Sequence, residues 1–435
     1  MKPLCVVSCP IDTFSGYGAR ARDFVKSLIQ SKGKEWDIKI LPQRWGDCPW
    51  NFLSEDDPLR KRFIGGLQQK PDVWIQITVP NEFQPVGKFN IGVSAGIETT
   101  IYPGEFIEGS NRMDLNLVSS NHSKQVALTT QFDKRNKNTQ QTVGVLKLEK
   151  PIEVLFEGLD LDKYYKKPSS SKLNILKDVK EDFCFLYTGH WLPGNLGEDR
   201  KNTGLLVKTF LETFKGPGRK KPALVMKTNQ VNYSLMDREE ILKMINYIKK
   251  SIPGNLPNIY LLHGEMTDNE MNQLNNDPKV KSFVSFTKGE GYGRPLVEAA
   301  ITGKPVIVSN WSGHKDFIHP DYNILIGGEL TNVHESTANQ FLLKESQWFS
   351  INTEIAGKAM KDVFKHYKQY FERSRKQTQY LKDNWSFDKM TERLKGFLNK
   401  IPIQKTVEVK LPQLKKLPKL ELNKQQFPKL KKQEV

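Results

Sequence analysis

Short apolar runs alternate with longer amphipathic runs along most of the chain, and this alternation restricts the possible folds more than any other feature. Apolar runs bounded by turn residues predict buried strands, whereas apolar residues three and four positions apart predict helices. Two successive series of strands and helices predict two doubly wound α/β domains with parallel sheets. The predicted strands cover residues 4–10, 37–43, 72–78, 90–96 and 115–120 in the first half and 183–189, 223–229, 259–264, 282–287 and 305–310 in the second.

A chain of 435 residues is too long for one hydrophobic core, which agrees with two domains. We predict a first domain over residues 1–150, a crossover over 151–175, a second domain over 176–360 and C-terminal helices that pack back across the domains over 361–400. Residues 401–435 form a Lys/Pro-rich tail in which Leu/Phe-Pro-x-Leu recurs three times. A tail of this kind either docks on a protein, a membrane or a nucleic acid, or has no partner and aids solubility.

The formal net charge is +17, and its densest part is the tail. Residues 1–150 hold 20 Lys and Arg against 16 Asp and Glu, and residues 401–435 hold 9 lysines against 3 glutamates. A basic chain favours polyanions such as DNA, anionic glycans or anionic lipid. A lysine-rich chain can equally reflect the base composition of its genome, so both readings stay open. We expect a cytoplasmic protein, because the four cysteines suggest no disulfide framework and no run of about 18 apolar residues predicts a transmembrane segment.

The stretch "KGEGYGRPLVEAAITGKPVI", residues 288–307, reads as a glycine-rich loop between a strand and a helix. Three glycines allow a sharp turn and close approach to a ligand, and Pro295 fits the first turn of the helix. The free N–H groups at the start of such a helix favour an anion, so we expect a phosphate-bearing ligand above this junction. Glu290 and Glu298 are ill-suited to phosphate itself and suit hydroxyl groups on either side of a diphosphate.

This order of glycines, acids, Pro295 and "GKPVI" resembles the retaining GT-B glycosyltransferases with the E-x7-E signature. The resemblance implies a GT-B fold, in which two Rossmann-like domains face a cleft and the first is the acceptor side. It implies that Glu290 contacts hydroxyls of the donor sugar and Glu298 contacts the ribose. Arg200 and Lys201, which precede a predicted helix, match the basic residues that neutralise the diphosphate, and no metal or cofactor is implied.

Further donor-binding candidates lie in the same loop and at other strand ends. The glycine turn after the first strand and residues at the end of the strand at 223–229 complete this set. His190 stands where the family often has arginine, so the resemblance assigns it no clear role. The additional donor-binding candidates are Gly291, Tyr292, Gly293, Arg294, Gly16, Gly18, Lys227, Asn229 and His190.

Glu98 follows another predicted strand in the first domain and is a catalytic candidate that could orient or deprotonate the acceptor hydroxyl. The alternative is a buried structural acid. Ser120 could cap the next helix, and His122 favours a structural or surface role over a catalytic one. The pair Asp160 and Asp162 resembles a metal–nucleotide motif of another transferase class, but its place in the crossover favours a structural role.

The resemblance implies a retaining, metal-independent transferase that moves a hexose or pentose from a nucleotide sugar to an acceptor hydroxyl. Overall basicity favours a hydroxymethylated base in DNA as the acceptor, and residues 81–100 resemble open reading frames of tailed phages, which would place the protein in the host cytoplasm. The alternative acceptor is a cell-envelope glycan or a lipid-linked sugar. A nucleotide-sugar 2-epimerase of the same architecture and a binding-only protein remain alternatives of other classes.

Overall fold

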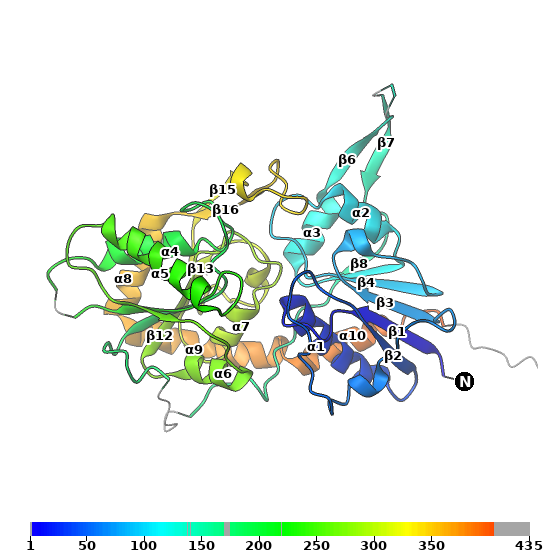
Figure 1. Ribbon diagram of the computed structural model, residues 1–435, viewed down its shortest axis with the longest axis horizontal. Helices are drawn as coiled ribbons and strands as arrows, with labels where there is room; N and C mark the ends of the chain where they lie inside the picture. The colour runs from blue at the N-terminus through cyan, green and yellow to red at the C-terminus, as the bar shows by residue number, and fades with distance from the viewer. Residues whose placement is uncertain (1, 137, 140, 169–174, 219, 404–435) are drawn as a thin grey trace, which may run out of the picture. The chain divides into compact units, whose positions relative to one another are not determined.

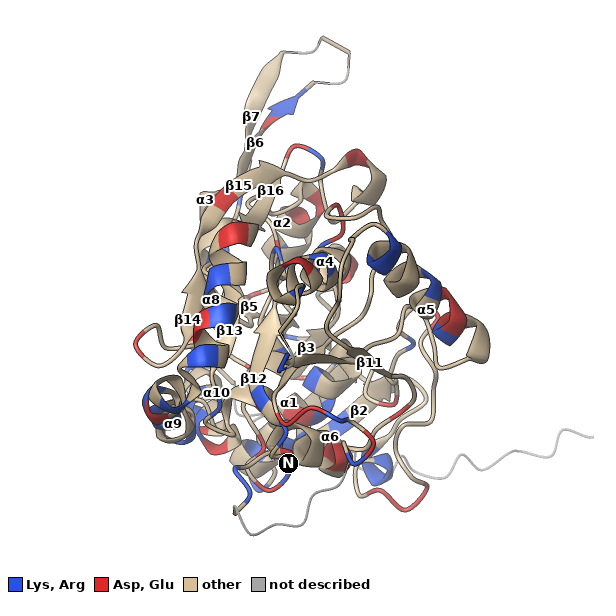
Figure 2. Cartoon of the chain, turned by 90° about the vertical axis from the view of Figure 1, so that its left-hand side faces the viewer, with Lys and Arg blue, Asp and Glu red and all other residues tan. Residues whose placement is uncertain are grey.

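A six-stranded parallel sheet forms the first lobe, residues 2–154, in the computed structural model, which describes residues 2–136, 138–139, 141–168, 175–218 and 220–403. The strand order is β2-β1-β3-β4-β5-β8, and every neighbouring pair is parallel. The strands are β1 Leu4–Cys9, β2 Asp37–Pro42, β3 Val73–Ile77, β4 Phe89–Val93, β5 Leu115–Val118 and β8 Ile152–Val154. The helices α1 Gly16–Lys32, α2 Gly104–Asn111 and α3 Asn121–Thr129 connect them. A hairpin of β6 Gln131–Arg135 and β7 Thr142–Lys147 projects from this lobe (Figures 1 and 2).

The second lobe, residues 184–365, repeats the plan with the strand order β11-β10-β9-β12-β13-β14, again all parallel. Its strands are β9 Cys184–Thr188, β10 Ala223–Lys227, β11 Ile259–Leu262, β12 Val280–Ser285, β13 Val306–Ser309 and β14 Ile324–Ile326. Its helices are α4 Thr203–Phe214, α5 Leu235–Lys250, α6 Asp268–Asn276, α7 Arg294–Ala300 and α8 Thr353–Lys365, and β15 Gly328–Asn332 pairs with β16 Gln347–Ile351. The strand order reverses between β9 and β12, and ligands of open α/β sheets bind at the carboxyl ends of such neighbouring strands.

The chain crosses between the lobes twice. The first crossing includes the described residues 155–168 and 175–183. The helices α9 Tyr367–Asn384 and α10 Phe387–Leu398 make the second, so that α10 packs against α1 of the first lobe. The backbone N–H of Phe387 donates to the carbonyl of Leu159 (2.8 Å), which ties the two crossings together.

All ten predicted strands overlap an observed strand, and two doubly wound α/β lobes are confirmed. The predictions did not include the edge strands β8 and β14, the projecting hairpin, the β15–β16 pair or α2. All four cysteines are free thiols. Among the described residues, no helix is long and apolar enough to cross a membrane. The tail from residue 404 lies outside the described residues.

Figure 2, in which the second lobe faces the viewer, shows basic and acidic residues interspersed along α5 and α8. These two helices therefore do not form a continuous basic surface.

Candidate functional site

The loop between β12 and α7 carries Glu290 to the switch point of the second sheet. Gly293 adopts a left-handed conformation (φ 104°) at the N-cap of α7, and Pro295 lies in the first turn, as the sequence predicts. A Cβ on Gly289 would overlap the carbonyl oxygen of Glu98, and one on Gly291 would overlap that of Ala95. These two glycines therefore let the loop approach the backbone of the first lobe, a neighbour that the sequence did not reveal.

Glu290 is a buried carboxylate held by two adjacent cations. Lys201 Nζ lies 2.6 Å from its Oε1, and Arg200 Nη1 lies 3.4 Å from its Oε2. Burial opposes ionisation of this carboxyl, but the two cations outweigh it and lower its pKa to about 2. Glu290 is thus an anion at any physiological pH, able to accept hydrogen bonds from hydroxyl groups but not to donate a proton.

Arg200 connects the two lobes through three acceptors. Its guanidinium donates to the carbonyl of Gly289 (2.8 Å), pairs with Glu290, and lies 3.6 Å from Glu98 of the first lobe. Glu98, the predicted acceptor-side acid, therefore meets the predicted donor-side cations. These charges come from three strand ends, after β4, β9 and β12, that the fold brings to one place.

A tight turn before α4, residues 199–202, holds Arg200 and Lys201 in position, and we call it the cation turn. Asp199 is buried, and its Oδ1 accepts from the backbone N–H of Asn202 (2.7 Å), which takes a left-handed conformation (φ 56°). This turn ends the strand-to-helix loop and directs Arg200 and Lys201 toward Glu290. The prediction that basic residues stand immediately before this helix is confirmed.

Lys227 and Asn229 lie at the end of β10, beside the cation turn, and both are buried. The Lys227 ammonium lies 5.0 Å from the centroid of the Tyr233 ring, and burial lowers its pKa. Within the described part of the chain, no acid pairs with it. The His190 side chain is exposed to solvent, and partial desolvation by its surroundings, followed by the nearby charge of Lys201, lowers its pKa.

Glu298 lies inside α7 and belongs to an ionic cluster between the lobes. Arg294 Nε is 3.2 Å from Glu298 Oε1, while its Nη2 is 2.6 Å from Asp23 of α1 and its Nη1 is 3.5 Å from Glu157 of the first crossing. Burial raises the pKa of Glu298 to about 7 despite the nearby arginine. Asp23 and Glu157 were missed by sequence reasoning, because nothing in their local sequence sets them apart from ordinary surface acids.

The remaining predicted residues lie near this centre in different ways. The Tyr292 side chain is buried in the core against Phe317 (ring centroids 4.8 Å apart), so it does not extend toward the charged centre. Gly18 packs against Thr13 at the start of α1, whereas a Cβ on Gly16 would meet open space. The glycine turn after β1 therefore leaves room beside Gly16 alone.

Several subsidiary expectations for the first half of the chain can be compared with the structure. Ser120 caps α3, as expected, and the His122 ring packs edge-on against Trp311 at 4.6 Å between the centroids. Burial lowers the pKa of His122 to about 4, which fits a structural role. Asp160 accepts from the backbone N–H of Asp162 (3.1 Å), a local turn interaction. Within the described ranges, no group of three or more His, Cys, Asp or Glu side chains is arranged to hold a metal ion.

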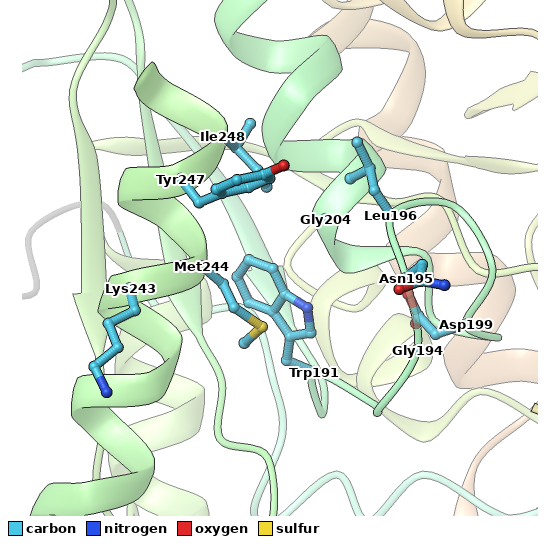
Figure 3. Close-up of a pocket in the computed structure, with 10 residues that line it drawn as sticks. All are labelled: Trp191, Gly194, Asn195, Leu196, Asp199, Gly204, Lys243, Met244, Tyr247 and Ile248. Atoms are coloured by element: carbon cyan, nitrogen blue, oxygen red, sulfur yellow. The ribbon is translucent and has the colours of Figure 1, made fainter. Parts of the chain in front are cut away.

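A cavity of about 340 Å³ lies on the other side of the cation turn, between its loop and α5 (Figure 3). Trp191, Met244 and Ile248 give it an apolar floor, and Tyr247 and Leu196 lie at its rim. Neither Glu290 nor Lys201 lines it. Asp199 of the cation turn lines this cavity, so the cavity adjoins the turn but is not part of the charged centre around Glu290.

Comparisons with solved structures identify this architecture. Anabaena HepE in complex with UDP and glucose superposes with a TM-score of 0.56 at 12% identity, covering 92% of this chain and 100% of that one. Sucrose-phosphate synthase from Thermosynechococcus elongatus gives 0.58 at 10% identity, covering 92% and 98%. A glycosyltransferase from Rickettsia africae gives 0.58 at 12% identity, covering 92% and 99%. No family model and no curated protein sequence matches this chain. The predicted GT-B fold is confirmed.

Proposed function

We propose that this protein is a retaining glycosyltransferase that moves a sugar from a nucleotide-sugar donor to an acceptor hydroxyl without a metal ion. One observation carries the proposal: Arg200 and Lys201 converge on Glu290 at the carboxyl ends of β9 and β12, where Arg200 also meets Glu98. A structure of similar fold, HepE, is described with UDP-glucose bound. The geometry supports a diphosphate site flanked by groups that bind hydroxyls.

The charges at this centre suit a diphosphate. Arg200 and Lys201 offset Glu98 and Glu290, so these four side chains sum to no net charge. Lys227 adds a buried cation that lacks an acid partner in the described residues. A diphosphate would contact Lys201, Arg200 and Lys227, and these fixed cations would stabilise the charge that develops on the leaving phosphate oxygen.

In the proposed reaction, the bond between the anomeric carbon and the phosphate oxygen breaks while a bond from that carbon to the acceptor oxygen forms on the same face. The departing phosphate takes the acceptor proton, and a nucleoside diphosphate leaves. Glu290 accepts hydrogen bonds from donor-sugar hydroxyls, and Glu298 accepts from the ribose. Glu98 orients the acceptor hydroxyl. This route requires no protein nucleophile.

The proposed acceptor is a hydroxymethylated base in DNA, which the net charge of +17 supports. The site itself lies between the lobes, where closure would exclude water from the donor. A cell-envelope glycan is the competing acceptor.

The direct test is a donor screen. The purified protein is mixed with UDP-, GDP-, ADP- and CMP-sugars, and thermal unfolding and slow donor hydrolysis are followed with and without EDTA. We expect one nucleotide class to raise the melting temperature and to be hydrolysed at an EDTA-independent rate, and NMR of the transfer product to show the donor's anomeric configuration. No shift with any donor would refute donor binding. Conversion of the donor to its 2-epimer without an acceptor would indicate an epimerase.

A further inference from the structure

Two loops of the first lobe bring together an exposed aromatic cluster. Residues after β1 contribute Phe14 and Tyr17, and residues after β2 contribute Trp45, Trp50 and Phe52; we call these five side chains the aromatic platform. Phe14, Trp50 and Phe52 are 43%, 36% and 42% exposed. Adjacent large aromatic side chains left open to solvent on a folded lobe mark a binding surface.

Four of the platform side chains are held in two ring pairs, and the backbone bridge between Thr13 and Trp50 places the fifth beside them. The rings of Tyr17 and Trp45 are stacked with centroids 4.0 Å apart, and Phe14 meets Phe52 edge-on at 5.0 Å. The Arg22 guanidinium lies 3.4 Å from the centroid of Phe52 and donates to the carbonyls of Ile11 and Thr13. A surface fixed in this way loses little side-chain freedom when a planar ring stacks on it.

The platform adjoins the charged centre. The Tyr17 hydroxyl accepts from the backbone N–H of Ala95 (3.1 Å), and the Ala95 carbonyl accepts from Ser119 Oγ (2.5 Å). The same Ser119 hydroxyl lies 2.9 Å from the carbonyl of Gly291, the residue after Glu290. A ring stacked on the platform would therefore lie on the acceptor side of the proposed transfer site.

A basic groove continues from the platform along α1. Lys26 follows Arg22 by one helical turn, and the groove of about 740 Å³ that it lines contains four cations and one acid. Lys39 pairs with Asp37, but Lys26 and Lys61 form no ion pair within the described residues. The groove is lined by Lys26, Ile29, Gln30, Lys39, Asp57, Pro58, Leu59, Lys61 and Arg62.

We propose that the aromatic platform and the basic groove together bind a nucleic-acid strand, with the acceptor base extruded onto the platform and the neighbouring phosphates in the groove. A positively charged groove beside stacking aromatics is the combination that binds single strands irrespective of sequence. An enzyme that acts on a base must take it out of the helical stack, and a stacking surface offsets part of that cost. Glu55 and Asp56 follow the platform in sequence but do not line the groove. The inference rests on the proposed function and specifies its acceptor class.

The groove favours a nucleic acid over a neutral glycan, because an uncharged sugar gains nothing from Lys26 and Lys61. Stacking contributes roughly 1–3 kcal/mol per base, so loss of one ring should weaken binding by roughly 5- to 150-fold. Each lysine that neutralises a phosphate of a single strand contributes about 0.7 to the slope of log affinity against log salt.

The experiment measures fluorescence anisotropy of a labelled single-stranded oligonucleotide, and of a duplex containing 5-hydroxymethylcytosine, with the full-length protein. Trp50→Ala and Phe52→Ala should each weaken binding by roughly 5- to 150-fold, and K26Q with K61Q should reduce the salt slope by about 1.4. Matched controls on α5 of the second lobe, Tyr247→Ala and Lys243→Gln, should bind as the wild type does. Circular dichroism and thermal unfolding establish that each variant is folded.

Platform and groove variants that bind the oligonucleotides within twofold of the wild type would overturn the proposal. So would variants that lose binding to labelled maltohexaose while oligonucleotide binding is unchanged, because the surface would then belong to a glycan. A failure of the proposed function can be distinguished from this outcome. In that case no nucleotide sugar would raise the melting temperature of the wild-type protein in the absence of nucleic acid.

Discussion

The cation pair before α4 allows the sharpest prediction, which concerns Lys201→Met. Lys201 lies nearer to Glu290 than Arg200 does, 2.6 Å against 3.4 Å, so its removal leaves the buried carboxylate with its weaker partner. The loss of one fixed donor at a developing charge lowers turnover by roughly 100- to 1,000-fold in comparable sites. We therefore expect a turnover at most about one hundredth of the wild-type value.

The same change should lower stability in a defined pH window. The pKa of Glu290 is about 2 in the folded chain against an ordinary value of 4.5, a net difference that corresponds to about 3 kcal/mol after burial has opposed the effect of the two cations. Because this pKa is lowered by folding, the stabilisation is fully present above pH 4.5 and is lost as the pH falls toward 2. Lys201→Met should thus reduce the free energy of unfolding at pH 7 by roughly 1–2 kcal/mol.

The assay is release of nucleoside diphosphate, resolved by anion-exchange chromatography, with the variant's fold checked by circular dichroism and urea unfolding. Lys243→Met is the matched control, because this lysine lies on α5 and pairs with the exposed Glu240. A folded Lys201→Met protein with turnover within twofold of the wild type would refute the diphosphate assignment.

Three further predictions concern the junction of the lobes. Arg294→Met should lower the melting temperature more than Asp23→Asn does, because it breaks three ion pairs rather than one, and an unchanged melting temperature would contradict this. Glu298 has a pKa raised to about 7 from 4.5, so the native state binds more protons and stability should fall as the pH rises through this window, then level off. Urea unfolding from pH 4 to 8 should show this slope in the wild type but not in Glu298→Gln. Gly291→Ala should weaken donor binding and lower the melting temperature, whereas Gly16→Ala, whose Cβ meets open space, should not alter stability; equal stability of the two variants would contradict the loop packing.

Local sequence patterns were enough to predict the two sheets. The strands of each sheet are near-continuous apolar runs buried on both faces, such as β9 and β10, and these runs are visible without tertiary information. The β15–β16 pair was missed because β15 is polar and mostly exposed, and the two strands pair only across a long connection. The β6–β7 hairpin was missed for a related reason, since most of its side chains are exposed.

The loop that carries Glu290 could be predicted because its glycines, acids and proline are adjacent in sequence. The residues that contact this loop from other parts of the chain could not be predicted. Glu98, Asp23 and Glu157 reach it from positions separated by more than one hundred residues, and only the packing of the lobes determines which acid meets which arginine. The aromatic platform was likewise not foreseen, because its two segments are far apart in sequence and meet only in the fold, through the pairing of β1 with β2 and the backbone bridge between Thr13 and Trp50.

The hydrogen bond between Phe387 and Leu159 fixes where the protein can bend. Both polypeptide connections between the lobes pass this point, so a separation of the lobes must pivot about it. The loop from Gly289 to Gly291 is held against the first lobe by noncovalent contacts alone. The two lobes can therefore separate there without unwinding a helix or breaking a sheet. Opening of that edge would break the polar contacts that cross it, among them Ser119 to Gly291, Arg200 to Glu98 and Arg294 to Asp23.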